Sequence, residues 1–566
     1  MYTIQEAQHS ALKALKSALG SAHAPSIDEL EYPKESKMGD LAYPCFGLAK
    51  SLKKKPNEIA TELAAKIGPK DLIKKVEAKG PYVNFFFDPV VFGEHLLKEI
   101  AVAKDKFGNS TSGKGKRIMV EYAQPNTHKT IHVGHLRNFV VGHALINILR
   151  AAGYEVIAAS YINDLGAHVA KCLWAIEKNH QGEDPADKDA LLAKAYVEAD
   201  KAAEKTKKAK EEMSEIYQEL ERGSRKWSGL WKKTRKWSLD SFARIFKELG
   251  MPIDVTYYES DLTKRTHQII KDLLKQGIAK ESDGAIVVDL EDQDLGVNLL
   301  VRTDGTLLYN AKDIALAERK EQDYEPARSI YVIDARQSLA MQQLFATLKL
   351  MGLKRNLEHL SYEFVTLKSG AMASRKGNVV KYDDFRDQMF ELALAETAKR
   401  HQDWTDKQLD RAAKKIAFAA MKFPMLKQDL DKMITFDMKE ALSFEGFSGP
   451  YILFSIARAK SILKKAEVKP VIKGKYYTQP VEHKLLVKLG MYPEVVLNIA
   501  GSSHLSALPQ YLFELAQTFS EFYEAVPVLK AESDEAVAAK LALVDATRQV
   551  LENGLALLGI ESLDEM

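Results

Sequence analysis

The stretch Glu121-Tyr-Ala-Gln-Pro-Asn-Thr-His-Lys-Thr-Ile-His-Val-Gly-His-Leu-Arg-Asn138 decides the fold of this 566-residue chain. The apolar run from Ile118 to Val120 before it predicts a strand, and the apolar spacing after it predicts a helix to about Ala152. Gly153 is typical of a helix end, and the run 155–162 predicts the next strand. Strand, helix and strand in this order form a βαβ unit, so we expect a parallel sheet.

Two histidines flank a glycine at the point where this strand turns into the helix. The start of a helix offers free backbone N–H groups and the positive end of the helix dipole, and both attract phosphate. Gly134 lacks a Cβ, so a ligand can approach the backbone there. His132 and His135 can donate hydrogen bonds to phosphate oxygens from the same side. The segment therefore predicts a site for a nucleotide triphosphate.

A metal site is the alternative explanation for the cluster of His128, His132, His135 and His143. The chain has no HExxH motif and only two cysteines, which are far apart in the sequence. Zinc would lack a plausible set of ligands. The sequence thus favours phosphate binding and predicts no protein-bound metal.

The composition is that of a multidomain globular protein. Hydrophobic residues make up 46% and charged residues 28%, and the formal net charge of +3 neither requires nor excludes a nucleic acid partner. At ~150 residues per domain, three or four domains are expected. No apolar run is long enough to span a membrane, and the first residues lack a signal-peptide pattern. We therefore expect a cytoplasmic protein without membrane contact.

Three domains are predicted from changes in the pattern along the chain. Residues 1–110 mix helical and strand-like runs and indicate an α+β domain. Residues 111–390 indicate a Rossmann-like α/β domain with a parallel sheet, interrupted at about 177–240 by a helical insertion. Residues 391–566 are almost entirely helical in pattern and indicate a helical bundle.

The insertion allows two interpretations. It mixes lysines and glutamates and ends in a segment rich in Trp and Lys, from Lys226 to Trp237. A solvated helical insertion is the interpretation that we favour. The alternative is a basic aromatic surface for RNA, because aromatic side chains can stack on bases.

A second motif, Ala371-Met-Ala-Ser-Arg375-Lys376-Gly-Asn378, follows a strand-like run. Two adjacent cations beside a glycine suit a loop that contacts phosphates. Alone this signal is weak, since surface loops rich in Lys and Gly are common.

Together the two motifs resemble the HIGH and KMSKS signatures of class I aminoacyl-tRNA synthetases, and the surrounding residues resemble the arginyl-tRNA synthetase family. The resemblance extends over nearly the whole chain. It is carried by segments 37–42, 81–85, 161–168, 304–315, 331–337, 444–451 and 545–548. The chain departs from the family pattern at His168, where Gln is usual, and at Thr547, where Leu is usual.

The resemblance implies a function for each domain. Residues 1–110 would be the additional domain that contacts the tRNA elbow, and residues 391–566 the anticodon-binding domain of the DALR type. The implied reaction joins L-arginine to ATP as arginyl-adenylate and then transfers arginine to the 3′ end of tRNA(Arg). ATP with Mg²⁺, arginine and tRNA would be the partners of a monomeric enzyme, and adenylate formation would need bound tRNA.

The resemblance also assigns the residues of the ATP site. His132, Gly134, His135, Met372, Ser374 and Lys376 would bind ATP. Lys129, Arg375 and Lys376 would stabilise the β/γ end during catalysis, together with the two histidines. In the KMSKS segment, Ala371, Ala373 and Ser374 replace the first Lys, the Ser and the second Lys. Which remaining cation supplies the missing charge stays open.

The residues that the resemblance assigns to arginine are Glu121, Asn126, His132, Tyr309, Asp313 and Gln337. A guanidinium has five fixed donors, so a pocket with two acids and an amide suits it. Asp313 alone could equally be an acid that favours a helix N-terminus. Glu121 is different, since an acid within an apolar strand is costly unless it is paired, and this favours a functional role.

Three other functions are compatible with parts of this pattern. Another class I enzyme is disfavoured, because the cysteine enzyme needs a metal site and the glutamate enzyme a cationic pocket. A relative that binds RNA without catalysis is motivated by Ala371 and Ala373, but the histidine pair and the acids are retained. A small-molecule nucleotidyltransferase would not need the long helical C-terminal region.

Overall fold

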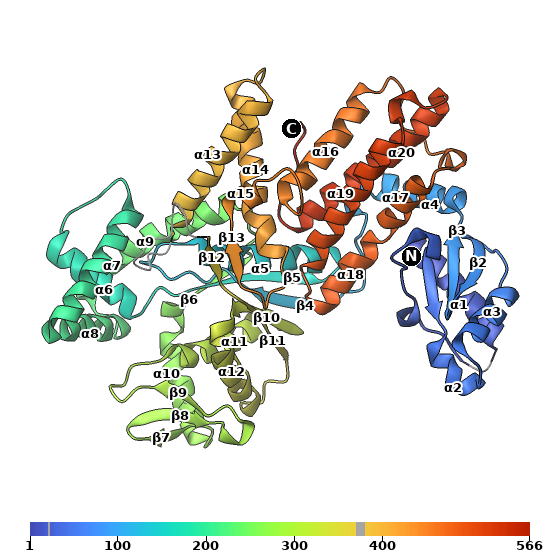
Figure 1. The fold of residues 1–566 in the computed structure, drawn as a ribbon. Helices are drawn as coiled ribbons and strands as arrows, with labels where there is room; N and C mark the ends of the chain where they lie inside the picture. Colours follow the sequence, from blue (N-terminus) through green and yellow to red (C-terminus); the bar gives the residue numbers. More distant parts are fainter. Residues whose placement is uncertain (21–22, 369–379, 566) are drawn as a thin grey trace.

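The computed structural model describes residues 1–20, 23–368 and 380–565 (Figure 1). Figure 1 shows a central sheet with a helical insertion on one side, a helical region above it and a small N-terminal unit apart from it. Arg375, Lys376, Met372 and Ser374 lie outside the described residues.

The central sheet has five strands in the order β11-β10-β4-β5-β6. They are β4 (Arg117–Glu121), β5 (Glu155–Ile162), β6 (Val255–Tyr258), β10 (Arg328–Asp334) and β11 (Asn356–Tyr362). Every neighbouring pair is parallel, which confirms the predicted parallel sheet. The strand order reverses between β4 and β10, and ligands of open α/β sheets bind at the carboxyl ends of the strands at such a point.

Helix α5 (Val133–Ala151) connects β4 to β5 and is almost wholly buried. Its apolar residues belong to one core with those of the strands, and this core includes Leu145, Val120 and Ala158. Gly153 follows the helix with φ +88°, a conformation that favours glycine. The predicted strand–helix–strand unit is therefore present.

The insertion is helical, as predicted. Its helices are α6 (Ala167–Asn179), α7 (Lys188–Lys205), α8 (Lys207–Glu221) and α9 (Arg225–Glu248), so the helical region begins before and ends after the predicted limits of about 177–240. Trp227 and Trp237 are only 6% and 7% exposed and belong to the apolar core of the insertion. Their burial supports the interpretation as a solvated helical insertion, because buried rings are unavailable for stacking on bases.

The rest of the middle region lies below the sheet in Figure 1. Its helices are α10 (Glu259–Lys275), α11 (Tyr309–Tyr324) and α12 (Ser338–Leu350). A three-stranded antiparallel sheet, β7-β8-β9, lies beside them, with β7 (Lys280–Ser282), β8 (Ala285–Asp289) and β9 (Val297–Val301).

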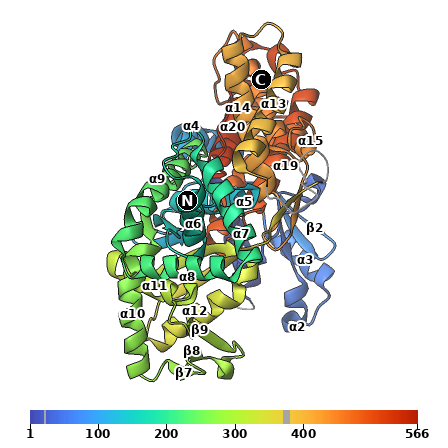
Figure 2. The same ribbon diagram turned by 90° about the vertical axis from the view of Figure 1, so that its left-hand side faces the viewer.

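The C-terminal region is helical, as predicted, and stands above the sheet in Figure 1 and above α5 in the turned view (Figure 2). Two short parallel strands, β12 (Val365–Leu367) and β13 (Ile434–Phe436), join it to the middle region. Its helices are α13 (Tyr382–Arg400), α14 (Asp406–Leu426), α15 (Met438–Ala441), α16 (Gly449–Lys465), α17 (Pro480–Gly490), α18 (Tyr492–Ser502), α19 (Ala507–Ala525) and α20 (Asp534–Leu557).

The N-terminal unit combines a sheet with helices, as predicted. Its antiparallel sheet has the order β1-β3-β2, with β1 (Leu41–Pro44), β2 (Ile73–Lys79) and β3 (Tyr82–Phe87). Its helices are α1 (Thr3–Leu19), α2 (Ala49–Leu52), α3 (Pro56–Lys66) and α4 (Pro89–Ala103). The His483 Nε2 atom of α17 lies 2.8 Å from both carboxylate oxygens of Asp40, which connects this unit to the helical region.

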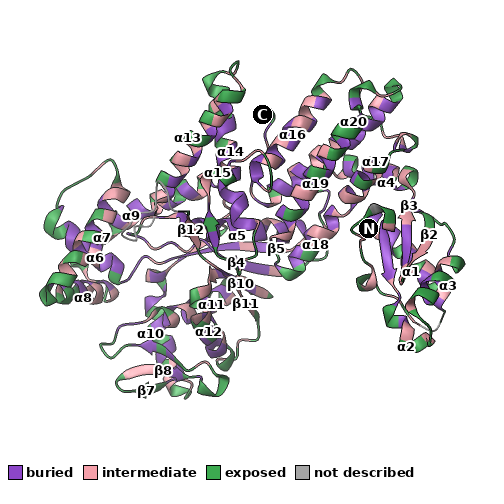
Figure 3. Ribbon diagram, viewed as in Figure 1, coloured by how far each residue is buried: buried purple, intermediate pink, exposed green. Residues whose placement is uncertain are grey.

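The buried residues lie mainly in the central sheet and on the inner faces of the helices, while the outer faces of α3 and α8 are exposed (Figure 3). In the described part of the chain, no helix has both the length and the apolar character to cross a membrane.

Candidate functional site

A cavity of about 940 Å³ lies at the carboxyl ends of β4 and β10, where the strand order reverses. It brings together all the predicted site residues that the structure describes, although they come from distant parts of the sequence. These are Glu121, Asn126, Lys129, His132, Gly134, His135, Tyr309, Asp313 and Gln337.

The two histidines cap the N-terminus of α5 reciprocally. The backbone N–H of Gly134 donates to Nδ1 of His132 at 3.1 Å, and the backbone N–H of His132 donates to Nδ1 of His135 at 3.2 Å. Each Nδ1 is therefore an acceptor, so each neutral ring carries its proton on Nε2. The pair can thus present two N–H donors to a ligand in the cavity.

Gly134 has a second role beyond access to the backbone. A Cβ at this position would lie 2.9 Å from the ring of His132. The glycine therefore makes room for the imidazole that caps the helix.

Both imidazoles are neutral at physiological pH. Burial, reinforced by the charge of Lys129, lowers the pKa of His132 to about 4. Burial, with the nearby His132 and Lys129, lowers the pKa of His135 to about 3. The rings can therefore donate hydrogen bonds to a ligand as neutral groups, and the positive charge beside them comes from Lys129 and the helix dipole.

The acidic end of the cavity is built on β4 and α11. The carboxylate of Glu121 is buried, and its Oε2 forms an ion pair with the buried ammonium of Lys320. The side-chain amide of Gln124 donates to Oε1 of Glu121 at 3.3 Å. Burial opposes the charge of Lys320, but the adjacent Glu121 outweighs it and raises the pKa of Lys320. Glu121 is thus paired with a cation from the protein itself.

Asp313 lies in the first two turns of α11 and lines the same cavity. Burial, with the charges of Glu121 and Glu259, raises its pKa to about 8. Glu259 itself forms an ion pair with Lys312. Asp313 has no ion pair with any residue of the described chain, so it is the carboxylate best placed to take a cationic ligand.

The other predicted residues surround the opening of the cavity. Tyr309 is 54% exposed, and Gln337 is exposed at the start of α12. Asn126 pairs with Asn163 in an isolated parallel bridge between two site segments. Lys129 is exposed, and its Nζ lies 5.5 Å from the centre of the Tyr196 ring of the insertion.

Several residues of the site were not predicted. Lys320 follows Asp313 by seven residues, which places both on one face of α11, and this spacing was an available signal. Asp334 and Arg336 line the cavity and form an ion pair of 2.8 Å. Asn138 donates to the backbone of Val332 at 2.7 Å and so joins α5 to β10.

No group of three or more His, Cys, Asp or Glu side chains within residues 1–20, 23–368 and 380–565 has an arrangement that could hold a metal ion. His128 lies apart from the histidine pair in its contacts, since its Nε2 is 2.8 Å from Oγ1 of Thr234 in α9. His143 is also buried elsewhere, against Gly559.

Comparison with protein families gives matches along most of the chain. The family described as tRNA synthetases class I (R), catalytic domain, matches residues 96–438. The arginyl tRNA synthetase N-terminal domain matches residues 5–87, and the DALR anticodon binding domain matches residues 452–566.

Individual relatives agree with the family matches. The chain is 35% identical to an arginine–tRNA ligase of Bdellovibrio bacteriovorus, and the alignment covers 98% of both chains. It is 34% identical to an arginine–tRNA ligase of Clostridium botulinum over 95% of this chain and 96% of the relative. The arginyl-tRNA synthetase structure of Thermus thermophilus superposes with a TM-score of 0.81 at 29% identity, covering 99% of this chain and all of the other.

Proposed function

This chain belongs to the arginyl-tRNA synthetase family of class I aminoacyl-tRNA synthetases, and from that premise we propose how its residues carry out the ATP-dependent ligation of arginine to tRNA(Arg). The observation that carries the proposal is the shared cavity. The helix N-terminus with its histidine pair and the carboxylate of Asp313 line the same space, so a triphosphate and a guanidinium can be held together.

The first step joins the two small substrates. An oxygen of the arginine carboxylate attacks the α-phosphorus of ATP, the bond to the bridging oxygen breaks, and pyrophosphate leaves. His132 and His135 donate from Nε2 to phosphate oxygens as negative charge moves towards pyrophosphate. Because these donors are already fixed by the cap of α5, little reorganisation accompanies the reaction. Lys129 adds positive charge at the same end.

Arginine is selected at the opposite end of the cavity. The carboxylate of Asp313 accepts hydrogen bonds from the guanidinium. Glu121, which is paired with Lys320, is the second carboxylate at this end of the cavity. Tyr309, Asn126 and Gln337 surround the remaining polar groups of the amino acid. A neutral or shorter side chain would leave the Asp313 carboxylate unpaired, which is strongly unfavourable in a buried site.

Mg²⁺ would accompany ATP and supply further charge for the phosphates. Glu121, Asp313 and Asp334 are the carboxylates among the described residues that line the cavity, and Glu121 and Asp334 are already paired with Lys320 and Arg336. Two of these three carboxylates are thus already paired with cations of the protein. The Mg²⁺ ion would therefore be held mainly by the phosphates.

In the second step the 3′-terminal ribose hydroxyl of tRNA attacks the activated carboxyl carbon, and AMP leaves. We propose that residues 391–566 bind the anticodon and residues 1–110 the tRNA elbow, with the middle region as the catalytic domain. We propose that the enzyme is a monomer. The monomer would act in the cytoplasm, where tRNA is used.

A charging assay tests the proposal. Purified protein, ATP, Mg²⁺ and total tRNA are incubated with each of the twenty amino acids in turn. We expect acid-precipitable label with arginine alone. Charging of tRNA with glutamate or cysteine would show that the pocket binds another amino acid. If the protein binds tRNA but charges it with no amino acid, it would be an RNA-binding relative without catalytic activity.

A further inference from the structure

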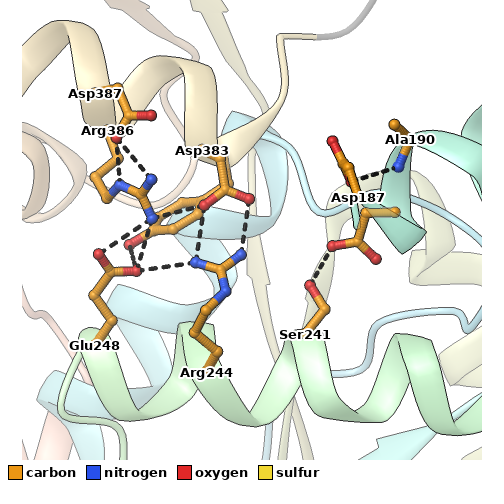
Figure 4. Close-up of polar contacts among 10 residues, drawn as sticks. Asp187, Ala190, Ser241, Arg244, Glu248, Asp383, Arg386 and Asp387 are labelled. Carbon is orange, nitrogen blue, oxygen red and sulfur yellow. Dashed lines mark hydrogen bonds and ion pairs between the residues drawn. The ribbon is translucent and has the colours of Figure 1, made fainter. Parts of the chain in front are cut away.

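A cluster of two guanidinium groups and three carboxylates joins the insertion to the start of α13 (Figure 4). Arg244 on α9 donates to both carboxylate oxygens of Asp383 on α13, at 2.9 and 2.8 Å. Arg386 donates to Asp383 at 2.7 Å and to Glu248 of α9 at 3.2 Å. Asp387 is the third carboxylate of the cluster, and it accepts a hydrogen bond of 2.8 Å from Nε of Arg386.

The first residues of α13 are tied in turn to the start of α5. The backbone N–H of Tyr382 donates to the carbonyl of Ile131 at 2.9 Å, and the backbone N–H of Val133 donates to the carbonyl of Val380 at 3.1 Å. These bonds flank an antiparallel bridge between His132 and Lys381. The segment that caps α5 is therefore paired with the residues that the ionic cluster holds.

Helix α9 also contacts two other segments of the site. Its Ser238 hydroxyl accepts from the backbone N–H of His128 at 2.9 Å. Its Arg235 donates to the buried carboxylate of Asp164 at 2.6 Å. The helix therefore runs past three site segments and contacts each of them through polar side chains.

We propose that Arg244 is a positioning residue for the phosphate-binding end of α5, acting through Asp383 and Arg386. Arg244 does not line the cavity, so it acts only through the segment 380–383. The bidentate pair sets the position of that segment, and the paired backbone then sets the position of the His132 cap. This inference rests on the proposed function, since its consequence is a slower reaction at the α-phosphate.

The kinetic consequence differs from that of a general loss of structure. Asp313 and Glu121, which the proposed function assigns to the guanidinium, lie on α11 and β4, outside the ion pairs of the cluster, so most of the arginine affinity is expected to be preserved. Arg244 and Asp383 side chains are 45% and 34% exposed, and partly exposed ion pairs contribute little to stability. A misplaced donor, in contrast, slows the chemical step strongly.

Arg244→Met tests the proposal, with Lys236→Met as its matched control. Lys236 lies eight residues earlier on the same helix and forms an exposed ion pair of 2.6 Å with Asp240, also on α9. Both variants remove one cation from α9, but only the first breaks an ion pair between α9 and α13. Charging is measured in single turnovers with saturating ATP and tRNA, at varied arginine, and thermal unfolding is recorded for each protein.

We expect Arg244→Met to lower the single-turnover rate about tenfold, with the arginine concentration at half-maximal rate within about twofold of wild type. Lys236→Met should match wild type in both quantities. Asp383→Asn removes the other partner and should give the same loss as Arg244→Met, whereas Asp383→Glu should restore most of the rate.

Two results would overturn the proposal. Equal rates for Arg244→Met and Lys236→Met would remove the positioning role. A rate loss accompanied by a proportionate loss of arginine affinity and a lowered unfolding temperature would show a general structural effect instead. Both results differ from failure of the proposed function, in which the wild-type protein itself would not charge tRNA with arginine.

Discussion

The ammonium of Lys320 pairs with the carboxylate of Glu121 at the acidic end of the cavity, and the side chains are only 2% and 4% exposed. Each of these buried charges is stabilised mainly by the other, because both are almost completely shielded from bulk water. Loss of one partner leaves an uncompensated buried charge, which costs more than the pair itself contributes.

We therefore expect Lys320→Met to lower the free energy of unfolding by roughly 3–5 kcal/mol. The double variant Glu121→Gln/Lys320→Met should recover most of this loss, because it removes both charges. Lys280→Met is the control, since it breaks an exposed pair with Asp289 and should cost no more than about 1 kcal/mol. Urea unfolding measures all three, and a double variant no more stable than Lys320→Met would contradict the pairing.

Asp313→Asn should weaken arginine binding selectively. The substitution keeps the shape of the side chain but removes the charge that faces the guanidinium. We expect the KM for arginine to rise about 100-fold, in line with loss of one partner of a buried charged pair, while the KM for ATP changes little. Equal effects on the two KM values in steady-state charging would contradict the assignment of Asp313 to the arginine pocket.

Arginine binding should become tighter as pH rises towards 8. The raised pKa of about 8 means that Asp313 is mostly protonated in the empty pocket at neutral pH. The guanidinium keeps its charge throughout, so only ionisation of Asp313 is needed for pairing. The KM for arginine should fall about tenfold per pH unit below pH 8 and level off above it. The KM for ATP should stay flat over this range, because His132 and His135 are already neutral.

The same ionisation predicts a pH dependence of stability. The folded protein keeps the proton on Asp313 up to about pH 8, whereas the unfolded chain loses it near the ordinary pKa of 3.8. The unfolded state therefore binds fewer protons between these values, and the contribution of Asp313 to stability falls as pH rises. Asp313→Asn should thus be more stable than wild type without ligand, by a margin that grows from pH 5 to pH 8. Thermal unfolding at both pH values measures the margin, and a constant difference would argue against the raised pKa.

His132 should show separable effects on stability and catalysis. His132→Ala removes the acceptor for the N–H of Gly134, so we expect a loss of about 1 kcal/mol of stability. His132→Asn supplies a new capping oxygen and should restore that stability. Both variants lack the Nε2 donor, so both should reduce adenylate formation by roughly 10²–10³-fold. An asparagine variant with near wild-type activity would show that the histidine serves only as a cap.

The central βαβ unit could be predicted from sequence because its signals are local. The apolar run at β4, the helical spacing of α5 and the glycine at position 153 each indicate one element and its limits. Strands β6 and β11 were not predicted, and both lie at the edges of the sheet. Edge strands are covered on fewer sides, so residues such as Glu358 and Ser361 remain half-buried and interrupt the apolar pattern.

The candidate site could be predicted as a set of residues but not as an arrangement of charges. The resemblance to the synthetase family identified Glu121 and Asp313, because these lie within recognisable motifs. Lys320 lies in the charged sequence Glu318-Arg-Lys-Glu321, which is typical of an exposed helix face. Only the packing of α11 against β4 buries its ammonium beside Glu121. Arg244 is similar, since its partner Asp383 is more than one hundred residues away in the sequence.

The guanidinium of Arg137 on α5 is fully buried and donates to the backbone carbonyls of Glu363, Lys432 and Asp429. Two of these acceptors come from a segment between α14 and β13, well beyond the strands of the central sheet. During synthesis, α5 is complete long before residues 429–432 leave the ribosome. Until they arrive, the Arg137 cation lacks two of its three partners and must stay hydrated. The core around α5 can therefore close only late, and a nascent chain that ends before residue 429 should remain open to proteases at this helix.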